Sequence, residues 1–593
     1  MPLQSGTGTE LAISRRYGLA RMLTIALVLS FASLFTLLPL LFGGSLVENL
    51  TLRLGSTQDM PLVWIFLLTA FLQPTPANSV AVDHRSPATA ALFVSVLFIL
   101  LAGAVGNHVV FHGYAVTRDE QMAIFDQQIF VHGRLLWPIP TDWRFVADAL
   151  NRRFMLPIGA NEFWVSGYLP VHSAFRALLA SIGISDLSSP LMAALSAVAL
   201  WTIARKLWPD SKDTAVLALL LLVTSSQVII TAMTAFSMSM HLALNLVWLA
   251  LFLADRRQTH AVAALVGFFA TGIHQPLFHP LFVLPFFLLL AEQRRCRLLG
   301  FYLASYALIG AFWMAWPLWI TSHGTSPPTA IHCASTICSS APGFIDRLRS
   351  ALTTFDVQHI WMTAANVLRF VCWQHPLLVP LALFGAMTCW RSEPLVRALA
   401  IGFVLPVVVM AVILPWQGHG WGYRYVHQVL GNAILLACYG FRQLETNGLS
   451  MRRPLIVSSA MALVLLPLHG WMAERVAAPF VRIHDELASI PADVVIVDTE
   501  VVPYGQDVVG NRFDLSNRPK LLIAALVKPA DLLALCKRST IVFYDSRRMA
   551  PIAQLFGMPP PKGASPQVRR LRELAKNAGC TMAPGTARSR EAA

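Results

Sequence analysis

Long apolar runs alternate with short polar segments along most of the chain up to residue 470. The runs are about 15 to 24 residues long, and a helix needs roughly 20 apolar residues to cross a bilayer. This pattern predicts about thirteen membrane-spanning helices, the second of them weak because its apolar core is short. The expected spans are residues 22–42, 56–72, 89–111, 190–207, 213–231, 238–254, 259–273, 276–291, 298–320, 374–390, 396–414, 426–441 and 454–470.

Basic residues recur in every second short loop of the later spans. The turns between those loops, at 231–237 and 274–275, contain neither Lys nor Arg. Positive residues favour the cytoplasmic side of a membrane, so the alternation fixes the predicted orientation. The segments expected to face outside are residues 112–189, 321–373 and 415–425 and the chain after residue 470.

The pattern divides the chain into three predicted parts. Residues 1–88 hold a cytoplasmic tail and two extra spans, and residues 89–470 form a transmembrane core with the outside loop 112–189. In that loop, the amphipathic stretches at about 142–155 and 164–183 are expected to be helices lying in the membrane interface.

Residues 471–593 form the third part, a predicted extracytoplasmic α/β domain. It contains the β-rich runs "ADVVIVD" and "STIVFYD", separated by the helical pattern of "KPADLLALCKR". A Pro-, Gly- and Ser-rich tail from about residue 557 is expected to be partly disordered. The predicted fold class is therefore an all-α polytopic membrane protein with a small extracytoplasmic α/β domain.

Composition agrees with this class and narrows the partners. Charged residues make up 13% of the chain, against about 25% in soluble proteins. Much of the net charge of +14 lies in short loops and the C-terminal tail. The positive charge therefore does not indicate a nucleic-acid-binding surface. The run 22–42 is too long for a signal peptide and has no A-x-A-like site after it, which predicts a retained span in the inner (plasma) membrane.

Four of the eight cysteines are expected outside the membrane, in an oxidising compartment. Cys333 with Cys338 and Cys536 with Cys580 are plausible disulfides, and free thiols are an equal alternative because spacing alone cannot fix the pairing. No Cys or His set has the spacing of a zinc site, so no metal ligand is predicted.

The first long polar loop carries two adjacent carboxylates, Asp119 and Glu120, just after an apolar run. Ionised groups at a membrane boundary must meet water, a cation or a partner. The alternative is a solvated helix start, where acidic residues favour the helix dipole. A functional interpretation needs partners on the same side of the membrane.

Such partners occur in two other outside turns. Arg424 is the only Lys or Arg in "WQGHGWGYRYVHQ" and can bind a phosphate with its planar fork of donors. Its alternative role is an interfacial anchor beside aromatic residues. His274 and His279 bracket a Pro-containing turn and can donate hydrogen bonds to a phosphate, although such histidines are more often structural.

These segments resemble the GT-C glycosyltransferases, which use sugars carried on a polyprenyl phosphate. "TRDEQMAIFDQQIFVHGRL" is similar to the acidic first-loop motif of that superfamily, and "GYLPVHSAFRALLASIGI" to the segment after it. "GYRYVHQVLGNAILLA" resembles the late Arg-Tyr motif near the donor phosphate. The resemblance covers roughly residues 89–470 and is greatest to the protein O-mannosyltransferase-like and aminoarabinose-transferase-like enzymes.

The resemblance implies a role for each candidate. Asp119 would be the general base of an inverting transfer, and Glu120 would position Asp119 or the acceptor, or help to hold a metal. Arg424, with Tyr425, would bind the phosphate of a polyprenyl-phosphate sugar, and His274 falls where many members have a basic residue. The sugar is a hexose, a pentose or an amino sugar, the extracytoplasmic acceptor is a protein, lipid or glycan, and the need for a divalent metal stays open.

Two other classes of membrane protein remain as alternatives, beside a non-catalytic scaffold. A secondary transporter fits the number of spans, but the span interiors offer Gln227 and Asn245 and essentially no acidic or basic side chain. A cell-envelope glycan polymerase or ligase would use a large late outside loop, for which residues 321–373 are a moderate candidate.

Overall fold

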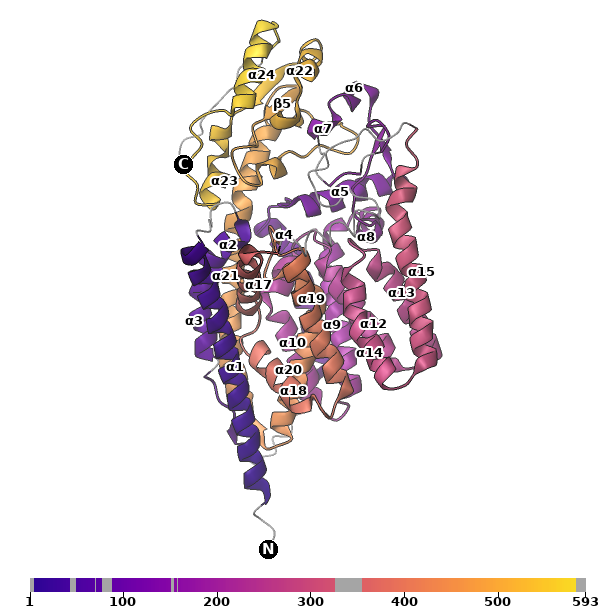
Figure 1. Ribbon diagram of the computed structural model, residues 1–593, viewed down its shortest axis with the longest axis vertical. Helices are drawn as coiled ribbons and strands as arrows, with labels where there is room; N and C mark the ends of the chain where they lie inside the picture. Colours follow the sequence, from indigo (N-terminus) through magenta and orange to yellow (C-terminus); the bar gives the residue numbers. More distant parts are fainter. Residues whose placement is uncertain are drawn as a thin grey trace.

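The protein is predominantly helical, and its long helices run side by side to form one bundle (Figure 1). The computed structural model describes residues 5–42, 49–69, 71–76, 88–150, 154–156, 158–325 and 355–582. The helices that follow the expected spans are α1 (Ser5–Phe42), α3 (Met60–Thr69), α4 (Ala88–Val109), α9 (Ser188–Leu207), α10 (Lys212–Val223), α11 (Ser226–Ala232), α12 (Met238–Ala254), α13 (Arg257–Thr271), α14 (Phe278–Glu292), α15 (Cys296–Thr321), α18 (Leu378–Cys389), α19 (Pro394–Ile413), α20 (Leu430–Glu445) and α21 (Arg452–Ala488).

The expected count of about thirteen spans is not confirmed. In the described part of the chain, six helices are long and apolar enough to cross a membrane, or seven if α10 and α11, which meet at a bend of 59°, form one span. The six are α1, α4, α9, α15, α19 and α21. The other helices are shorter, such as α18 with 12 residues.

The outer faces of the long helices are apolar. Leu40 of α1, Phe93 of α4 and Leu308 of α15 are 80%, 68% and 74% exposed, although they are large hydrophobic side chains. Such side chains are at home in hydrocarbon rather than in water, because lipid does not penalise apolar surface. These faces fit a membrane protein whose bundle is surrounded by lipid.

The expected span 56–72 is a different structure. It consists of α2 (Leu50–Leu54), the π-helical turn η1 (Gly55–Asp59) and the ten-residue α3. Asp59 is fully buried and forms an ion pair with Arg369 of α17 (Val357–Cys372), with 3.3 Å between Oδ2 and Nη1. The expectation that the spans contain essentially no charged side chain is therefore wrong at Asp59, because Arg369 provides the opposite charge.

Helix α21 continues far beyond the expected end of its span at residue 470. It is 37 residues long and reaches from the bundle into the C-terminal domain (Figure 1). Buried residues follow one face of its second half at helical spacing, among them Ala473, Val476, Phe480, Ile483 and Leu487. This apolar stripe packs against protein, so the helix needs no membrane to continue.

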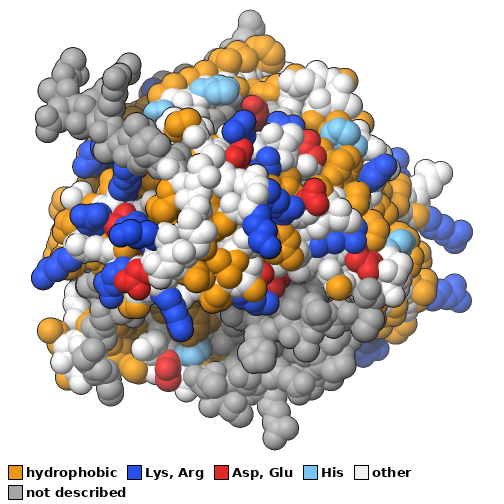
Figure 2. Space-filling view, turned by 90° about the horizontal axis from the view of Figure 1, so that it is seen from above, with side chains coloured by type: hydrophobic (Ala, Val, Ile, Leu, Met, Phe, Trp, Pro, Cys, Tyr) orange, Lys and Arg blue, Asp and Glu red, His pale blue; other side chains and the backbone are white. Residues whose placement is uncertain are grey.

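The C-terminal domain has a three-stranded parallel sheet in the order β6-β5-β7. The two predicted β-rich runs form β5 (Val494–Val497) and β7 (Ile541–Tyr544), and β6 (Lys520–Ile523) was not predicted. The accompanying helices are α22 (Pro529–Cys536), α23 (Ala550–Leu555) and α24 (Pro566–Asn577). Seen from above, this end of the molecule carries Lys and Arg side chains interspersed with Asp and Glu, as a water-facing surface does (Figure 2).

Part of the tail from residue 557 is ordered rather than disordered. Val568, Leu571 and Ala575 of α24 are buried, because they recur on one face of that helix. The rest of that prediction falls on residues 583–593, outside the described residues.

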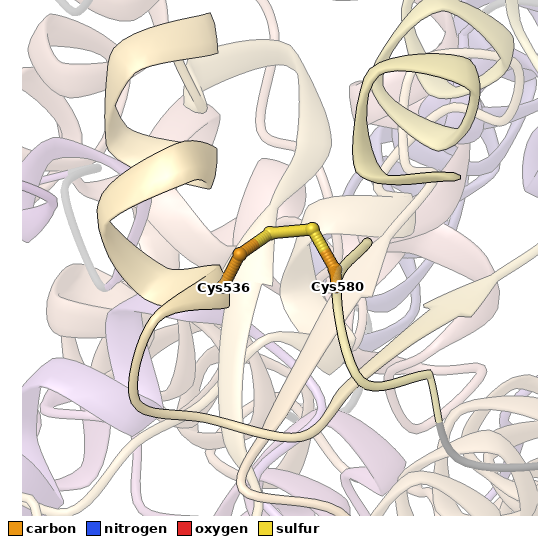
Figure 3. The surroundings of a disulfide bond; sticks show 2 residues. All are labelled: Cys536 and Cys580. Atoms are coloured by element: carbon orange, nitrogen blue, oxygen red, sulfur yellow. A yellow bond between two sulfur atoms is a disulfide. The ribbon is translucent and has the colours of Figure 1, made fainter. Parts of the chain in front are cut away.

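One of the two proposed disulfides is present and the other is not tested. Cys536, at the end of α22, is bonded to Cys580, which follows α24 (Figure 3). The proposed pair Cys333 and Cys338 lies outside the described residues.

The loop 112–189 packs against the C-terminal domain. Its elements are α5 (Arg118–Val131), β2 (Trp137–Pro138), α6 (Thr141–Arg144), α7 (Ala147–Leu150), β3 (Phe163–Trp164) and α8 (Val171–Ala180). The expected interfacial helix at 142–155 is wrong, because α6 and α7 have four residues each. Their apolar residues join those of α5 and of strands β5, β6 and β7 in one buried cluster, so protein rather than lipid covers them.

Candidate functional site

Helix α5 begins at Arg118 because the sequence before it supplies a cap. The Thr117 hydroxyl accepts from the backbone N–H of Glu120 at 3.3 Å, and the Glu120 carboxylate accepts from the N–H of Thr117 at 3.2 Å. This capping box satisfies two free donors of the first helical turn. It places Asp119 in that turn, at the end of the bundle that carries the C-terminal domain (Figure 1).

The C-terminal domain fixes the start of α5 from the other side. Arg118 donates to the backbone carbonyls of Val509, at 3.0 Å, and Gln506, at 2.6 Å. Gln121 donates to the carbonyl of Asp507 at 2.7 Å. The helix that carries Asp119 is therefore clamped by a segment almost 400 positions later in the chain, a contact that the sequence did not predict.

The carboxylate of Asp119 has a partner on each oxygen. Arg424 Nη1 lies 2.7 Å from Oδ2, and the side chains of Arg424 and Asp119 are only 15% and 12% exposed. The hydroxyl of Tyr168 donates to Oδ1. The structure thus brings the predicted acid and the predicted cation into contact and adds a tyrosine.

Asp119 stays ionised in this environment. Burial by itself would raise the pKa of Asp119, but the charge of Arg424 and the hydrogen bonds from Tyr168 and Arg424 outweigh it and lower the pKa below its ordinary value of 3.8. A carboxylate held in this way is a weak base for as long as Arg424 remains its partner.

Arg424 opens the 3₁₀ helix η3 (Arg424–Val429) and keeps spare donor capacity. Its Nη2 donates to the Tyr425 hydroxyl at 3.2 Å, and Nη1 also donates to the carbonyl of His419 at 3.3 Å. Its Nε is buried and has no partner among the described residues. Tyr425 therefore supports the guanidinium, and its predicted role in binding a phosphate stays a prediction.

The loop that carries Arg424 is held by the buried ion pair of the N-terminal segment. Arg369, the partner of Asp59, donates from Nη2 to the carbonyl of Gly420 at 2.9 Å. Asp59 also accepts from Trp373 Nε1 at 2.9 Å. The N-terminal segment, predicted as two extra spans, thus helps to fix the loop before Arg424.

Glu120 lies next to Asp119, but its carboxylate is bonded to Thr117 and to a backbone N–H. It is buried, and its carboxylate accepts from Thr117 and from the backbone N–H of Ala235 at 3.2 Å. Burial raises the pKa of Glu120 to about 7 against the opposing effect of these hydrogen bonds. Since its oxygens are already engaged, the two carboxylates do not form a free ligand pair, and no group of three or more His, Cys, Asp or Glu in the described residues could hold a metal.

His274 is also at the site, but as a neutral ring. It stacks on Tyr168 with 3.9 Å between the ring centroids. Burial lowers the pKa of His274 to about 4 despite the nearby charge of Asp119. His279 lies elsewhere, between Asn245 and Tyr306 at 2.7 Å each, so both of its nitrogens already have a partner.

Tyr168 and Asp126 were not predicted. Asp126 accepts from the backbone N–H of Ser166 at 2.9 Å and from its hydroxyl, and Ser166 Oγ in turn accepts from the N–H of Tyr168 at 3.3 Å. This chain of contacts positions the tyrosine. The one available signal was that Asp126 follows Asp119 by seven residues and so shares its helix face.

A pocket opens beside Asp119 and Tyr168. Its other lining residues are Ala123, Leu169, His172, Ser173, Phe236, Ser237, Ile273 and His274. No Lys or Arg is among them. The ionised carboxylate of Asp119 therefore has a cation on one side and a small, mainly apolar pocket on the other.

Together, the fold and this site define a helical membrane protein with a buried carboxylate–guanidinium pair at one end of its bundle. No family model matches the chain, and no curated protein matches it. Among solved structures, it is similar to ArnT from Cupriavidus metallidurans bound to undecaprenyl phosphate, with 14% identity, a TM-score of 0.42 and coverage of 71% of this chain and 84% of that one. The same protein in the apo state gives 14% identity, a TM-score of 0.43 and the same coverage. At this level the likeness assigns neither substrate nor site residues to the chain.

Proposed function

We propose that this protein transfers a sugar from a polyprenyl-phosphate donor to an acceptor outside the cytoplasm. The observation that carries the proposal is the 2.7 Å pair of Asp119 and Arg424 at the end of an apolar bundle. A lipid-linked donor needs a place for its chain among the helices and a cation for its phosphate at the end of the bundle. The exposed apolar faces and Arg424 supply both.

In the proposed mechanism, Asp119 takes the proton from the hydroxyl or amine of the acceptor. The acceptor atom attacks the anomeric carbon while the bond from that carbon to the phosphate oxygen breaks, so the configuration at the carbon inverts. The electron pair of the broken bond leaves with the phosphate. Arg424, supported by Tyr425, stabilises that charge in a site of low polarity, where such interactions are strong.

The state of Asp119 would change when the donor binds. A phosphate that takes the guanidinium of Arg424 removes the partner that lowers the pKa of Asp119. The carboxylate then becomes a stronger base at the moment when the donor is in place. His274, neutral and stacked on Tyr168, would assist through a hydrogen bond rather than as a cation.

The disulfide supports an extracytoplasmic position for the C-terminal domain. Disulfides persist in oxidising compartments and are rare in the cytosol, and Cys536 and Cys580 are joined. The domain packs on α5 through Arg118 and Gln121, so the site would share its side of the membrane. We infer an inner-membrane enzyme that acts on a protein, lipid or glycan at the outer surface.

The test is sugar transfer by purified protein in lipid nanodiscs. Labelled polyprenyl-phosphate hexoses, pentoses and amino sugars are offered with a periplasmic or cell-surface extract as acceptor. An enzyme releases free lipid phosphate, whereas a transporter does not. Arg424→Ala should abolish the release in a folded protein. Arg397→Ala, which removes the pair of Arg397 with the half-exposed Glu292, should not. Release by Arg424→Ala at the wild-type rate would exclude the proposed site.

A further inference from the structure

Gln227 is a buried polar residue of the bundle that the proposed mechanism does not use. It belongs to α11, directly after the bend of 59° between α10 and α11, and its side chain is fully buried. An amide buried among helices costs free energy unless its donors and acceptors have partners. The partners of Gln227 therefore indicate why the bundle contains it.

The side-chain amide of Gln227 uses its whole hydrogen-bonding capacity, and half of that capacity goes to one residue. Its Nε2 donates to the backbone carbonyl of Tyr423 at 2.9 Å, and its Oε1 accepts from the backbone N–H of Tyr423 at 3.3 Å. Nε2 also lies 3.4 Å from Nδ1 of His427, and Oε1 also accepts from Nε2 of Gln374 at 2.8 Å. A carbonyl only accepts and an N–H only donates, so the two bonds to Tyr423 fix which way the amide points.

The loop that ends in Arg424 is shaped to approach Gln227 closely. Gly422 has a φ of +68°, a conformation that residues with a side chain rarely adopt. A Cβ atom at this position would lie 2.4 Å from Oε1 of Gln227, which is too close for a non-bonded contact. The glycine therefore indicates, independently of the hydrogen bonds, that the backbone before Tyr423 is fitted to this amide.

The bonds of Gln227 help to fix the peptide group that precedes Arg424. The carbonyl of Tyr423 and the N–H of Arg424 belong to one planar peptide unit. Gln227 holds the carbonyl end of this unit, and the side-chain oxygen of Gln417 accepts from the N–H end at 2.9 Å. Since both ends are bonded, the unit cannot turn freely, and the direction in which the Arg424 side chain leaves the backbone is set. That side chain reaches Asp119 at 2.7 Å.

We propose that Gln227 is a positioning residue, which orients Arg424 for a phosphate group by holding the backbone of Tyr423. The proposal rests on the proposed function, in which Arg424 binds the donor phosphate, and it assigns a part in that function to the bent pair of α10 and α11. Gln227 acts only through Arg424. Its loss should therefore weaken the recognition of a phosphate and leave the recognition of a polyprenyl chain unchanged.

Two variants of Gln227 test this role. Gln227→Met has a similar length and removes all four bonds of the amide. Gln227→Asn keeps an amide for the neighbouring polar groups, which protects folding, but it is one methylene shorter and cannot make both bonds to Tyr423. Asn432→Leu is the matched control, because Asn432 is a buried amide of α20 that donates to the carbonyl of Leu399 in α19, outside the loop.

The experiment compares the affinities for undecaprenyl phosphate and for undecaprenol, which has the same chain without the phosphate, in a nonionic detergent. We expect both Gln227 variants to bind undecaprenyl phosphate about tenfold more weakly than the wild type, the effect of one hydrogen bond to a charged group. They should bind undecaprenol like the wild type, and Asn432→Leu should bind both lipids like the wild type. In an Arg424→Ala background, Gln227→Met should cause no further loss, because the effects of residues that act through one contact do not add.

Three results would overturn the proposal: wild-type affinity of the folded Gln227 variants for undecaprenyl phosphate, an equal loss of affinity for undecaprenol, or a further loss in the Arg424→Ala background. If the wild type binds undecaprenyl phosphate no better than undecaprenol, it is the proposed function that fails. Hydrogen exchange at residues 417–424 then decides the role of Gln227. Faster exchange there in Gln227→Met than in the wild type and Asn432→Leu supports that role, and unchanged exchange overturns it.

Discussion

The carboxylate of Asp119 and the guanidinium of Arg424 are 305 positions apart in the sequence and 2.7 Å apart in the structure. Both side chains are nearly buried, so water screens their attraction far less than at an open surface. The pair has a consequence for binding, since an incoming phosphate must compete with Asp119 for Arg424. Base strength and phosphate affinity are therefore coupled through one guanidinium.

Asp119→Asn should separate these two effects. General-base catalysis contributes about 10²- to 10⁴-fold to a rate, so turnover should fall by roughly that factor. The affinity for undecaprenyl phosphate should rise, because the amide no longer competes for Arg424. The measurements are released lipid phosphate and lipid binding in nanodiscs. Asp142→Asn, at an exposed aspartate of the same loop, is the control. Unchanged turnover of Asp119→Asn would exclude Asp119 as the general base.

Asp126 makes a pH-dependent contribution to stability, and a substitution at this one position should remove that contribution. Burial raises the pKa of Asp126 from 3.8 to about 7, against the opposing hydrogen bonds from Ser166. The folded protein therefore holds this proton more tightly than the unfolded chain does. Its contribution to stability is complete below pH 3.8 and is lost as the pH rises towards 7.

Asp126→Asn resembles the protonated form and cannot ionise. At about pH 4, the stability of this variant should be close to that of the wild type. At about pH 8, its free energy of unfolding should be higher by up to a few kcal/mol, since one pKa unit corresponds to about 1.36 kcal/mol, and its melting temperature should be higher too. Thermal unfolding in detergent at the two pH values measures the difference. Asp142→Asn should show no such change, and a constant gap between Asp126→Asn and the wild type would contradict the assignment.

Asp119 and Arg424 could be predicted from the sequence because each has an unusual position in it. Asp119 begins a helix at a membrane boundary, and Arg424 is the one basic residue in its short outside loop. Tyr168 escaped notice because a lone Tyr in a polar loop has no pattern of its own, and Asp126 had only its spacing of seven residues from Asp119 as a signal. Their importance depends on contacts between α5 and the segment at residues 166–168, which only the folded chain reveals.

The elements themselves were predictable to different degrees. Strands β5 and β7 are short runs of β-branched and aromatic residues, which is a local property, and both were predicted. The lengths of the spans were not predicted correctly, because hydropathy does not distinguish a helix that faces lipid from one that faces protein. Half of the residues of α18 are buried, and this helix packs against α1 and α20. Helix α21 instead leaves the apolar region and continues on an amphipathic stripe, which the sequence shows from Ala473 onward.

Asp59→Ala should destabilise the protein strongly although it lies in a different segment from the site. Removing one partner of a buried ion pair leaves the charge of Arg369 uncompensated, which typically costs about 3–5 kcal/mol. The affinity for undecaprenyl phosphate should fall as well, because Arg369 also holds Gly420 in the loop of Arg424. Thermal unfolding in detergent and lipid binding measure the two effects.

Glu292→Ala provides the comparison for Asp59→Ala. Glu292 is 52% exposed in its pair with Arg397, and surface pairs contribute about 0–1 kcal/mol. Its removal should leave the melting temperature and lipid binding almost unchanged. Equal effects of the two substitutions would show that the Asp59 pair has no special role in stability.

Removal of the Cys536–Cys580 bond should loosen the C-terminal domain. The two residues are 44 positions apart, and closing a loop of that length stabilises a folded protein by about 4 kcal/mol in the chain-entropy model. Cys536→Ser with Cys580→Ser should therefore melt at a lower temperature and lose hydrogen-exchange protection first in α24, which lies between the two cysteines. In wild-type protein taken from cells and denatured, these thiols should react with maleimide only after reduction, whereas the free Cys296 reacts without it. Reaction of all three without reductant would contradict both the bond and the oxidising location of the domain.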